Sequence, residues 1–128
     1  MSRDIIRKDR KKQHIEEYSK SQYKNTTLFE DIYIDHNSLP ELNLDEIDTK
    51  IKFLGKVVQY PIMINAITGG TRFSQGINRD LSKIAKEYNI PIAVGSQTIA
   101  LKDKESYETF KIVRNIIGKD GVVLANLN

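Results

Sequence analysis

The chain has 128 residues, of which 39% are hydrophobic and 29% charged, with a net charge of +3 and no cysteine. This size suits one ordinary domain, and the composition is typical of a soluble globular protein rather than a disordered one. The lack of cysteine excludes disulfides, zinc–thiolate sites and thiol nucleophiles. No signal-like apolar segment opens the sequence, and no apolar run approaches the ~20 residues of a membrane span. We therefore expect a cytoplasmic protein that contacts no membrane.

The first 25 residues form the most basic part of the chain, with eight lysines and arginines against four acids. Helix-forming residues dominate positions 5–22 and predict a helix there. Such charge is typical of a solvated helix, or of contact with a nucleic acid or a small-molecule phosphate. The nucleic-acid alternative depends on charge alone, because aromatic residues are few beyond Tyr18 and Tyr23.

Residues 26–50 mix apolar and acidic residues and predict an irregular connection with short helical or extended pieces. Residues 51–58 (IKFLGKVV) predict a two-stranded β-ribbon with Gly55 at its turn. Neither His14 nor His36 follows a predicted strand, and no cluster of acidic and histidine residues has metal-ligand spacing. We therefore predict no catalytic residue and no metal site within this chain.

Three short apolar runs follow, at residues 61–67 (PIMINAI), 91–96 (PIAVGS) and 121–127 (GVVLANL). Runs of this kind predict strands that are buried on both faces. Two helical segments alternate with them. The order β-α-β-α-β predicts right-handed crossovers and a parallel sheet covered by helices.

The first of these helices is predicted from Ser74, as its N-cap, to about Tyr88. Its apolar residues repeat with the helical period and predict the face turned to the core: Ile77, Leu81, Ile84, Ala85 and Tyr88. The second helix is predicted from about Lys104 to Ile117, with Gly118 as its C-cap. Its predicted core face contains Tyr107, Phe110, Val113 and Ile117.

Each predicted strand ends in small or polar residues, at positions 68–70 (TGG), 95–96 (GS) and 125–126 (AN). In parallel α/β folds the carboxyl ends of the strands carry the chemistry, so we predict one shared site. Glycine after a strand lets the backbone approach a ligand and leaves N–H groups free to bind it. Taken alone, the Gly69-Gly70 pair is more typical of a tight turn. Asn65, predicted to be buried, either bonds the backbone or contacts a ligand, and Ser96 either caps a turn or binds a ligand.

Three strands are fewer than the eight of a closed barrel, and the sequence stops on the third. We therefore expect a fragment of a larger α/β barrel. The alternative is a small open sheet of three strands.

Four segments, in order and at plausible spacing, resemble the type 2, FMN-dependent isopentenyl-diphosphate isomerases. They are residues 10–15 (RKKQHI), 29–48 (FEDIYIDHNSLPELNLDEID), 64–70 (INAITGG), and 94–97 (VGSQ) with 124–127 (LANL) behind it. The resemblance implies a TIM (β/α)8 barrel. Residues 1–60 would be an N-terminal extension, and residues 61–128 the first β-α-β-α-β part.

The resemblance also implies residue roles. FMN contacts fall on Ala66, Ile67, Thr68, Ser96 and Asn126. Substrate contacts fall on Arg10, Lys11, His14, Ser96, Gln97 and Thr98. Arginine and lysine suit a diphosphate, because one offers a planar fork and the other a point charge. The sequence departs from the family at Ile67 (usually Met), Thr98 (often Arg) and Asn128 (usually Gly).

The implied reaction interconverts isopentenyl diphosphate and dimethylallyl diphosphate with FMN kept reduced by NADPH, and with Mg²⁺ on the diphosphate. The full-length protein is implied to be a homo-oligomer that binds no nucleic acid. The acid/base and metal residues of the family lie beyond this chain. We therefore expect the 128 residues alone to be inactive and to bind FMN weakly or not at all. The alternative enzyme is another FMN barrel, such as an oxidoreductase that acts on 2-hydroxy acids.

Overall fold

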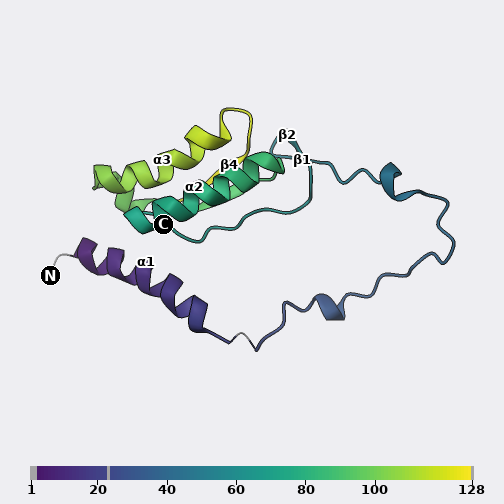
Figure 1. The fold of residues 1–128 in the computed structure, drawn as a ribbon, viewed down its shortest axis with the longest axis horizontal. Helices are drawn as coiled ribbons and strands as arrows, with labels where there is room; N and C mark the ends of the chain where they lie inside the picture. The colour runs from purple at the N-terminus through teal and green to yellow at the C-terminus, as the bar shows by residue number, and fades with distance from the viewer. Residues whose placement is uncertain (1–2, 23, 128) are drawn as a thin grey trace.

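The computed structural model describes residues 3–22 and 24–127, with only the backbone described for residues 3–5, 7–8 and 11–12. Helices and strands alternate along the second half of the chain, as predicted (Figure 1). The helices and strands are α1 (Arg3–Lys20), β1 (Ile51–Phe53), β2 (Lys56–Val58), α2 (Arg72–Glu87), β3 (Ile92–Ser96), α3 (Lys104–Ile117) and β4 (Val123–Asn126). Short 3-10 turns lie at Phe29–Asp31, Leu44–Glu46 and Thr98–Leu101.

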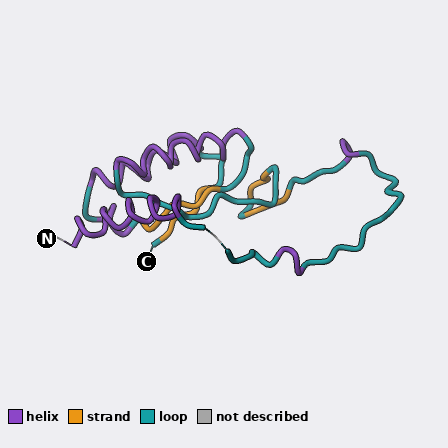
Figure 2. The backbone as a smooth tube through the Cα atoms, turned by 60° about the horizontal axis from the view of Figure 1, so that its bottom comes forward, coloured by secondary structure: helices purple, strands orange, loops and turns teal. Residues whose placement is uncertain are grey.

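The body of the molecule is a parallel strand pair with two helices on one face. β3 pairs with β4 in the register Ile92↔Val123 and Ser96↔Asn126. α2 and α3 lie side by side over the pair in both views (Figures 1 and 2). The core between the layers consists of Ala85, Ile90, Ile92, Val94, Ile99, Phe110, Val113 and Ile117. The predicted α/β class and parallel pairing are confirmed, while the described residues form no closed barrel.

The prediction of a buried strand at residues 61–67 is wrong. This segment makes an isolated parallel bridge, Ile64 to Ile92, rather than a strand. The Ile64 N–H donates to the Pro91 carbonyl at 3.0 Å, and the Ala93 N–H donates to the Ile64 carbonyl at 2.8 Å. Ile62 and Ile67 are 60% and 65% exposed. The segment runs parallel beside β3, as predicted, but no strand among the described residues pairs with its other edge. β4 is likewise half-buried or exposed rather than buried on both faces.

The predicted start and core face of α2 need correction. Thr71, not Ser74, is the N-cap: its hydroxyl accepts from the Ser74 N–H at 3.1 Å, and the Ser74 hydroxyl accepts from the Thr71 N–H at 3.2 Å. The buried side chains of α2 are mostly small or polar: Ser74, Asn78, Ser82 and Ala85. Ile84 and Tyr88, predicted to face the core, are 45% and 51% exposed. The reason is that α3 packs on the small, polar face and so decides which side of α2 is buried.

α3 agrees with its predicted range, and Gly118 follows it with φ 78°, as expected of a C-cap glycine. Three of its four predicted core residues are buried, whereas Tyr107 is 49% exposed. Asp103 caps the N-terminus, where its carboxylate accepts from the Glu105 N–H at 3.2 Å.

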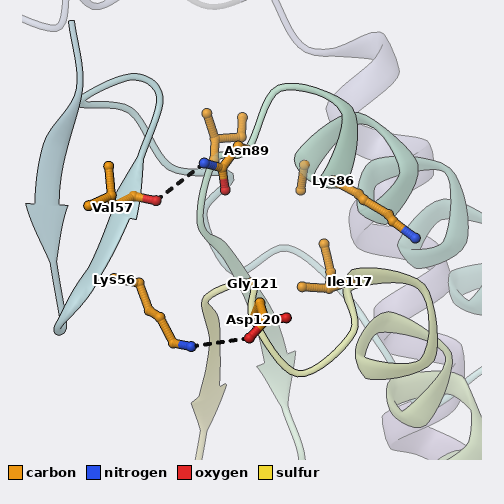
Figure 3. Close-up of a pocket in the computed structure, with 9 residues that line it drawn as sticks. Lys56, Val57, Lys86, Asn89, Ile117, Asp120 and Gly121 are labelled. Carbon is orange, nitrogen blue, oxygen red and sulfur yellow. Dashed lines mark hydrogen bonds and ion pairs between the residues drawn. The ribbon is translucent and has the colours of Figure 1, made fainter.

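The hairpin β1–β2 turns at Leu54 and Gly55, with φ values of 48° and 79°. Two residues with positive φ suit the tight two-residue hairpin turn, so the predicted ribbon and its turn glycine are confirmed. Figure 3 shows the hairpin attached at the amino ends of the strands, where the Asn89 side chain donates to the Val57 carbonyl at 3.2 Å and Lys56 pairs with Asp120 at 3.6 Å. A hollow of about 360 Å³ lies between them.

The predicted helix at residues 5–22 is present as α1, and the predicted irregular connection follows it. Residues 24–48 are all exposed and lead away from the body in a long loop (Figures 1 and 2). The predicted short helical pieces are its two 3-10 turns. Among the described residues, no helix combines the length and the apolar character needed to cross a membrane.

Candidate functional site

The ends of the three predicted strand segments lie next to one another at one edge of the body. The Gly95 N–H donates to the Thr68 carbonyl at 3.2 Å, which aligns the first segment with the end of β3. Ser96 is in register with Asn126, and the Gln97 N–H donates to the Asn126 carbonyl at 2.8 Å. This backbone pairing places Thr68, Ser96 and Asn126 on three adjacent strand ends.

Thr68 stands out at this edge because its hydroxyl is buried and has no partner. The residue is 3% exposed, and its Oγ1 bonds to nothing among the described residues. A buried hydroxyl without a partner costs about 1–3 kcal/mol, so such groups usually have a protein, water or ligand partner. The Thr68 hydroxyl is thus one polar group that a ligand at the strand ends could satisfy.

Ser96 and Thr98 lie together beside this edge. Their hydroxyl oxygens are 3.1 Å apart, and both residues are half-buried. Gln97, between them, is also half-buried. The buried side chain of Ile99 anchors the 3-10 turn that begins at Thr98. The fold therefore gathers the predicted substrate residues of this loop with the predicted cofactor residues Ser96 and Asn126.

The segment before Thr68 is open to solvent. Ile67 is 65% exposed, and Ala66 is half-buried. Asn65 is exposed, so the prediction of a buried asparagine is wrong; its Oδ1 accepts from the Ala66 N–H at 2.7 Å. An exposed apolar Ile67 next to a buried hydroxyl offers both a flat apolar contact and a hydrogen-bonding group.

Side chains of α3 contact the glycine pair, Gly69 and Gly70, and bond to its backbone. The Gly70 N–H donates to the Thr109 hydroxyl at 2.8 Å, and the Ser106 hydroxyl donates to the Gly70 carbonyl at 2.9 Å. A Cβ on Gly69 would lie 2.0 Å from Cε1 of Phe110. The prediction that this loop leaves its N–H groups free is therefore wrong for Gly70. Its glycines permit close packing on α3, which fixes the position of Thr68.

Sequence reasoning missed Ser106 and Thr109, which support the glycine loop. Thr109 is also linked to α2, because the Asn78 side chain donates to its carbonyl at 3.1 Å. One sequence pattern could have indicated this contact between α2 and α3. Small polar residues recur every four positions on α2, at Ser74, Asn78 and Ser82. Such a polar stripe indicates a close helix contact as readily as an exposed face.

The predicted residues of α1 are exposed and are not part of the cluster at the strand ends. Arg10 and His14 are exposed, and the side chain of Lys11 lies outside the described residues. The helix reaches the glycine loop through Asp9, which lines a hollow of about 240 Å³ with Gly70, Thr71, Arg72, Phe73, Glu105 and Thr109. Within residues 3–22 and 24–127, no group of three or more metal-binding side chains is placed to hold an ion.

Fold and strand ends together define the class: an α/β unit of parallel strands whose carboxyl ends bring small and polar residues together. No family model matches the chain. The chain is 40% identical over 127 residues to a Listeria innocua protein named isopentenyl-diphosphate delta-isomerase. This match covers 98% of the chain and 35% of the Listeria protein. A Bacillus pumilus protein of the same name is 48% identical over 125 residues, and the match covers 96% of the chain and 35% of that protein. A Pyrococcus furiosus protein of the same name is 44% identical over 108 residues, and that match covers 80% of the chain and 27% of the protein.

The chain is thus a homologue of the isopentenyl-diphosphate delta-isomerases, and the predicted family resemblance is confirmed. It spans about a third of the length of the curated relatives that it matches.

Proposed function

We propose that the chain supplies the N-terminal extension (residues 1–60) and the first strands (residues 61–128) of a type 2, FMN-dependent isopentenyl-diphosphate isomerase built on a TIM barrel. The observation that carries the proposal is the meeting of Thr68, Ser96 and Asn126 at one edge. It is found in a chain that is 39–48% identical, over nearly its whole length, to proteins named isopentenyl-diphosphate delta-isomerase. The substrates would be isopentenyl diphosphate and dimethylallyl diphosphate.

Ala66, Ile67, Thr68, Ser96 and Asn126 would hold the flavin. Their fit is supported by the unpaired, buried hydroxyl of Thr68 and by the exposed apolar side chain of Ile67. When bound, reduced FMN would supply an acid/base or charge-stabilising centre for a 1,3-proton shift without net redox change, and NADPH would keep it reduced. The residues of this chain bind and orient it: Phe110 and Thr109 fix the loop that carries Thr68.

Substrate binding would fall to the basic helix and the loop after β3. Arg10 and Lys11 would bind the diphosphate, because Arg and Lys match a dense anion in charge and in donor geometry. Ser96, Gln97 and Thr98 would contact the same substrate from the strand ends, and His14 would lie nearby. Mg²⁺ would neutralise the diphosphate through ligands supplied beyond this chain, together with the acid/base groups. The chain alone would be inactive, and the complete enzyme would be a homo-oligomer.

The first test is a chimera in which this chain replaces its matching region in the Bacillus pumilus relative. We expect isomerase activity that requires FMN, and a raised Kd for FMN when Thr68→Val removes the unpaired hydroxyl. Thr27→Val, in the exposed loop of residues 24–48, is the matched control and should leave the Kd unchanged. Activity without FMN, or equal effects of the two variants, would contradict the proposal.

A second test separates the isomerase from another FMN barrel enzyme, such as an oxidoreductase. In the same chimera, Arg10→Ala with Lys11→Ala should raise KM for the diphosphate substrate at least tenfold, because two charges leave its binding site. The control removes two charges elsewhere in the basic first 25 residues, with Lys20→Ala and Lys24→Ala. Equal KM values in both double variants would favour the oxidoreductase alternative.

A further inference from the structure

We propose that Asp103 and Ser106 of α3 are positioning residues for the strand-end site, because the one proton of the Ser106 hydroxyl has two acceptors. When the proton goes to the Asp103 carboxylate, the Gly70 carbonyl loses its donor from α3. Asp103 thereby controls how firmly α3 holds the loop of residues 68–70. The anchoring is a property of the fold, while its effect on FMN rests on the proposed function.

The Ser106 hydroxyl lies within hydrogen-bonding distance of two oxygen atoms. Its Oγ is 2.9 Å from the Gly70 carbonyl oxygen and 2.6 Å from Oδ2 of Asp103. Ser106 is 1% exposed, so bulk water does not compete for its proton. A hydroxyl has one proton to donate, and a carbonyl and an ionised carboxylate can only accept. With Asp103 ionised, Ser106 therefore donates to one of the two oxygens at a time.

The second contact of α3 with the loop, through Thr109, involves no such competition. The Thr109 hydroxyl donates to the Ser106 carbonyl at 2.6 Å and accepts from the Gly70 N–H at 2.8 Å. One donated and one accepted bond agree with the single proton and the lone pairs of a hydroxyl. Gly70 thus has a constant anchor at its N–H, and an anchor at its carbonyl that depends on where the Ser106 proton lies.

The Asp103 carboxylate is the stronger of the two acceptors. Its Oδ1 accepts from the Glu105 N–H at 3.2 Å at the N-terminus of α3, where the helix dipole favours a negative charge. Hydrogen bonds to an ionised acceptor are shorter and roughly twice as strong as neutral ones, and the contact with Asp103 is the shorter of the two. Ser106 therefore donates mainly to Asp103, and the Gly70 carbonyl oxygen then faces a lone pair of the Ser106 hydroxyl.

The Gly70 carbonyl connects this competition to the strand-end site. It shares a peptide unit with the Thr71 N–H, which donates to the Ser74 hydroxyl at 3.2 Å in the cap of α2. Gly70 also lies two positions after Thr68, whose buried hydroxyl has no partner among the described residues. Firm anchoring of the Gly70 carbonyl would fix the loop before a ligand binds, and so reduce the cost of ordering it on binding.

Asp103→Asn tests the shared proton in the chimera with the Bacillus pumilus relative. The asparagine oxygen keeps the cap on α3, because Asn and Asp are equally good N-caps, and its amide group donates to the Ser106 oxygen. The Ser106 proton is then available to the Gly70 carbonyl. In the flavin-free chimera, we expect amide exchange at Gly70 and Thr71 to slow about fivefold, as one net hydrogen bond would cause. The Kd for FMN should fall by a similar factor.

Two controls separate the shared proton from a general effect of charge. Glu105→Gln removes a negative charge from an exposed side chain of the same helical turn, and should leave the exchange unchanged. In a Ser106→Ala background, Asp103→Asn should no longer slow the exchange, because the hydroxyl that carries the proton is gone. Unchanged or faster exchange in Asp103→Asn alone would overturn the proposal, as would equal slowing with and without Ser106.

The flavin measurement tests the positioning role. An unchanged Kd for FMN in Asp103→Asn, despite slower exchange, would mean that the anchored loop does not position Thr68 for the flavin, and would overturn that role. Binding of FMN by the unsubstituted chimera tests the proposed function separately. A chimera that binds no FMN but shows slowing that depends on Ser106 would support the anchoring and contradict only the proposed function.

Discussion

The strand–helix body at residues 61–127 and the arm at residues 3–50 use their apolar side chains in opposite ways. In the body, Ile92, Val94 and Val113 are 1% exposed. In the arm, Phe29, Tyr33 and Ile34 are 74%, 83% and 79% exposed. The proposed flavin residues belong to the packed region, and the proposed diphosphate residues Arg10 and Lys11 belong to the arm. The packed region can therefore fix a rigid ring system, whereas the arm contributes charge.

The largest expected change in the free energy of unfolding comes from replacing a phenylalanine of the body, compared with one of the arm. Phe110→Ala should lower the free energy of unfolding by about 3–5 kcal/mol, because a buried ring against Gly69 leaves a cavity. Phe29→Ala should change it by less than about 0.5 kcal/mol, because that ring is mostly exposed. Urea unfolding followed by circular dichroism measures both. If Phe110→Ala is unfolded without urea, Phe110→Leu should show a smaller loss; similar values for Phe110→Leu and Phe29→Ala would contradict the contrast.

Alanine substitutions at two glycines of the body should change the free energy of unfolding in opposite directions. Gly69→Ala should lower the free energy of unfolding by about 1–3 kcal/mol, because the added methyl meets the Phe110 ring. Gly76→Ala should raise it by about 0.5–1 kcal/mol, because Gly76 lies within α2 and a Cβ there would contact nothing within 4 Å. Thermal unfolding of the pair checks this, and a stabilised Gly69→Ala would mean that the ring moves away freely.

A loss of similar size is expected where α3 holds the glycine loop. Thr109→Val keeps the volume but removes the hydroxyl that accepts from Gly70, leaving a buried N–H unpaired at about 1–3 kcal/mol. Thr109→Ser retains the hydroxyl and should recover most of that stability. Amide exchange at Gly70 provides the specific readout: it should accelerate in Thr109→Val and stay slow in Thr109→Ser.

The smallest effect concerns pH and the surface of α2. Hydrogen bonding from Arg79 lowers the pKa of Asp80, with further help from Lys83. A lowered pKa stabilises the folded state above the ordinary aspartate value of about 3.9, and this contribution is lost as pH falls through the folded value. Asp80→Asn should lower the free energy of unfolding slightly at pH 7, and this difference should disappear as pH falls through the folded pKa of Asp80, because the carboxyl is then protonated. A change at pH 7 as large as that of Thr109→Val would contradict this assignment, because exposed ion pairs contribute little.

The prediction from sequence succeeded where local chemistry is decisive. Apolar continuity identified β3, helical spacing and Gly118 bounded α3, and Gly55 marked the hairpin turn. The strand ends could be predicted to meet, because parallel strands with short crossovers leave no other arrangement. The Ser106 and Thr109 contacts to Gly70 could not, since they join positions 36 and 39 residues apart.

The sequence by itself thus determined the order of elements, their approximate bounds and the grouping of Thr68, Ser96 and Asn126, because periodicity and turn chemistry are local. Only the tertiary structure decided which surfaces are buried. An apolar run at residues 61–67 predicts burial, but burial requires neighbours on both sides, and here β3 supplies one. α2 likewise buries Asn78 rather than Ile84, because the neighbouring helix, not hydrophobicity alone, chooses the face.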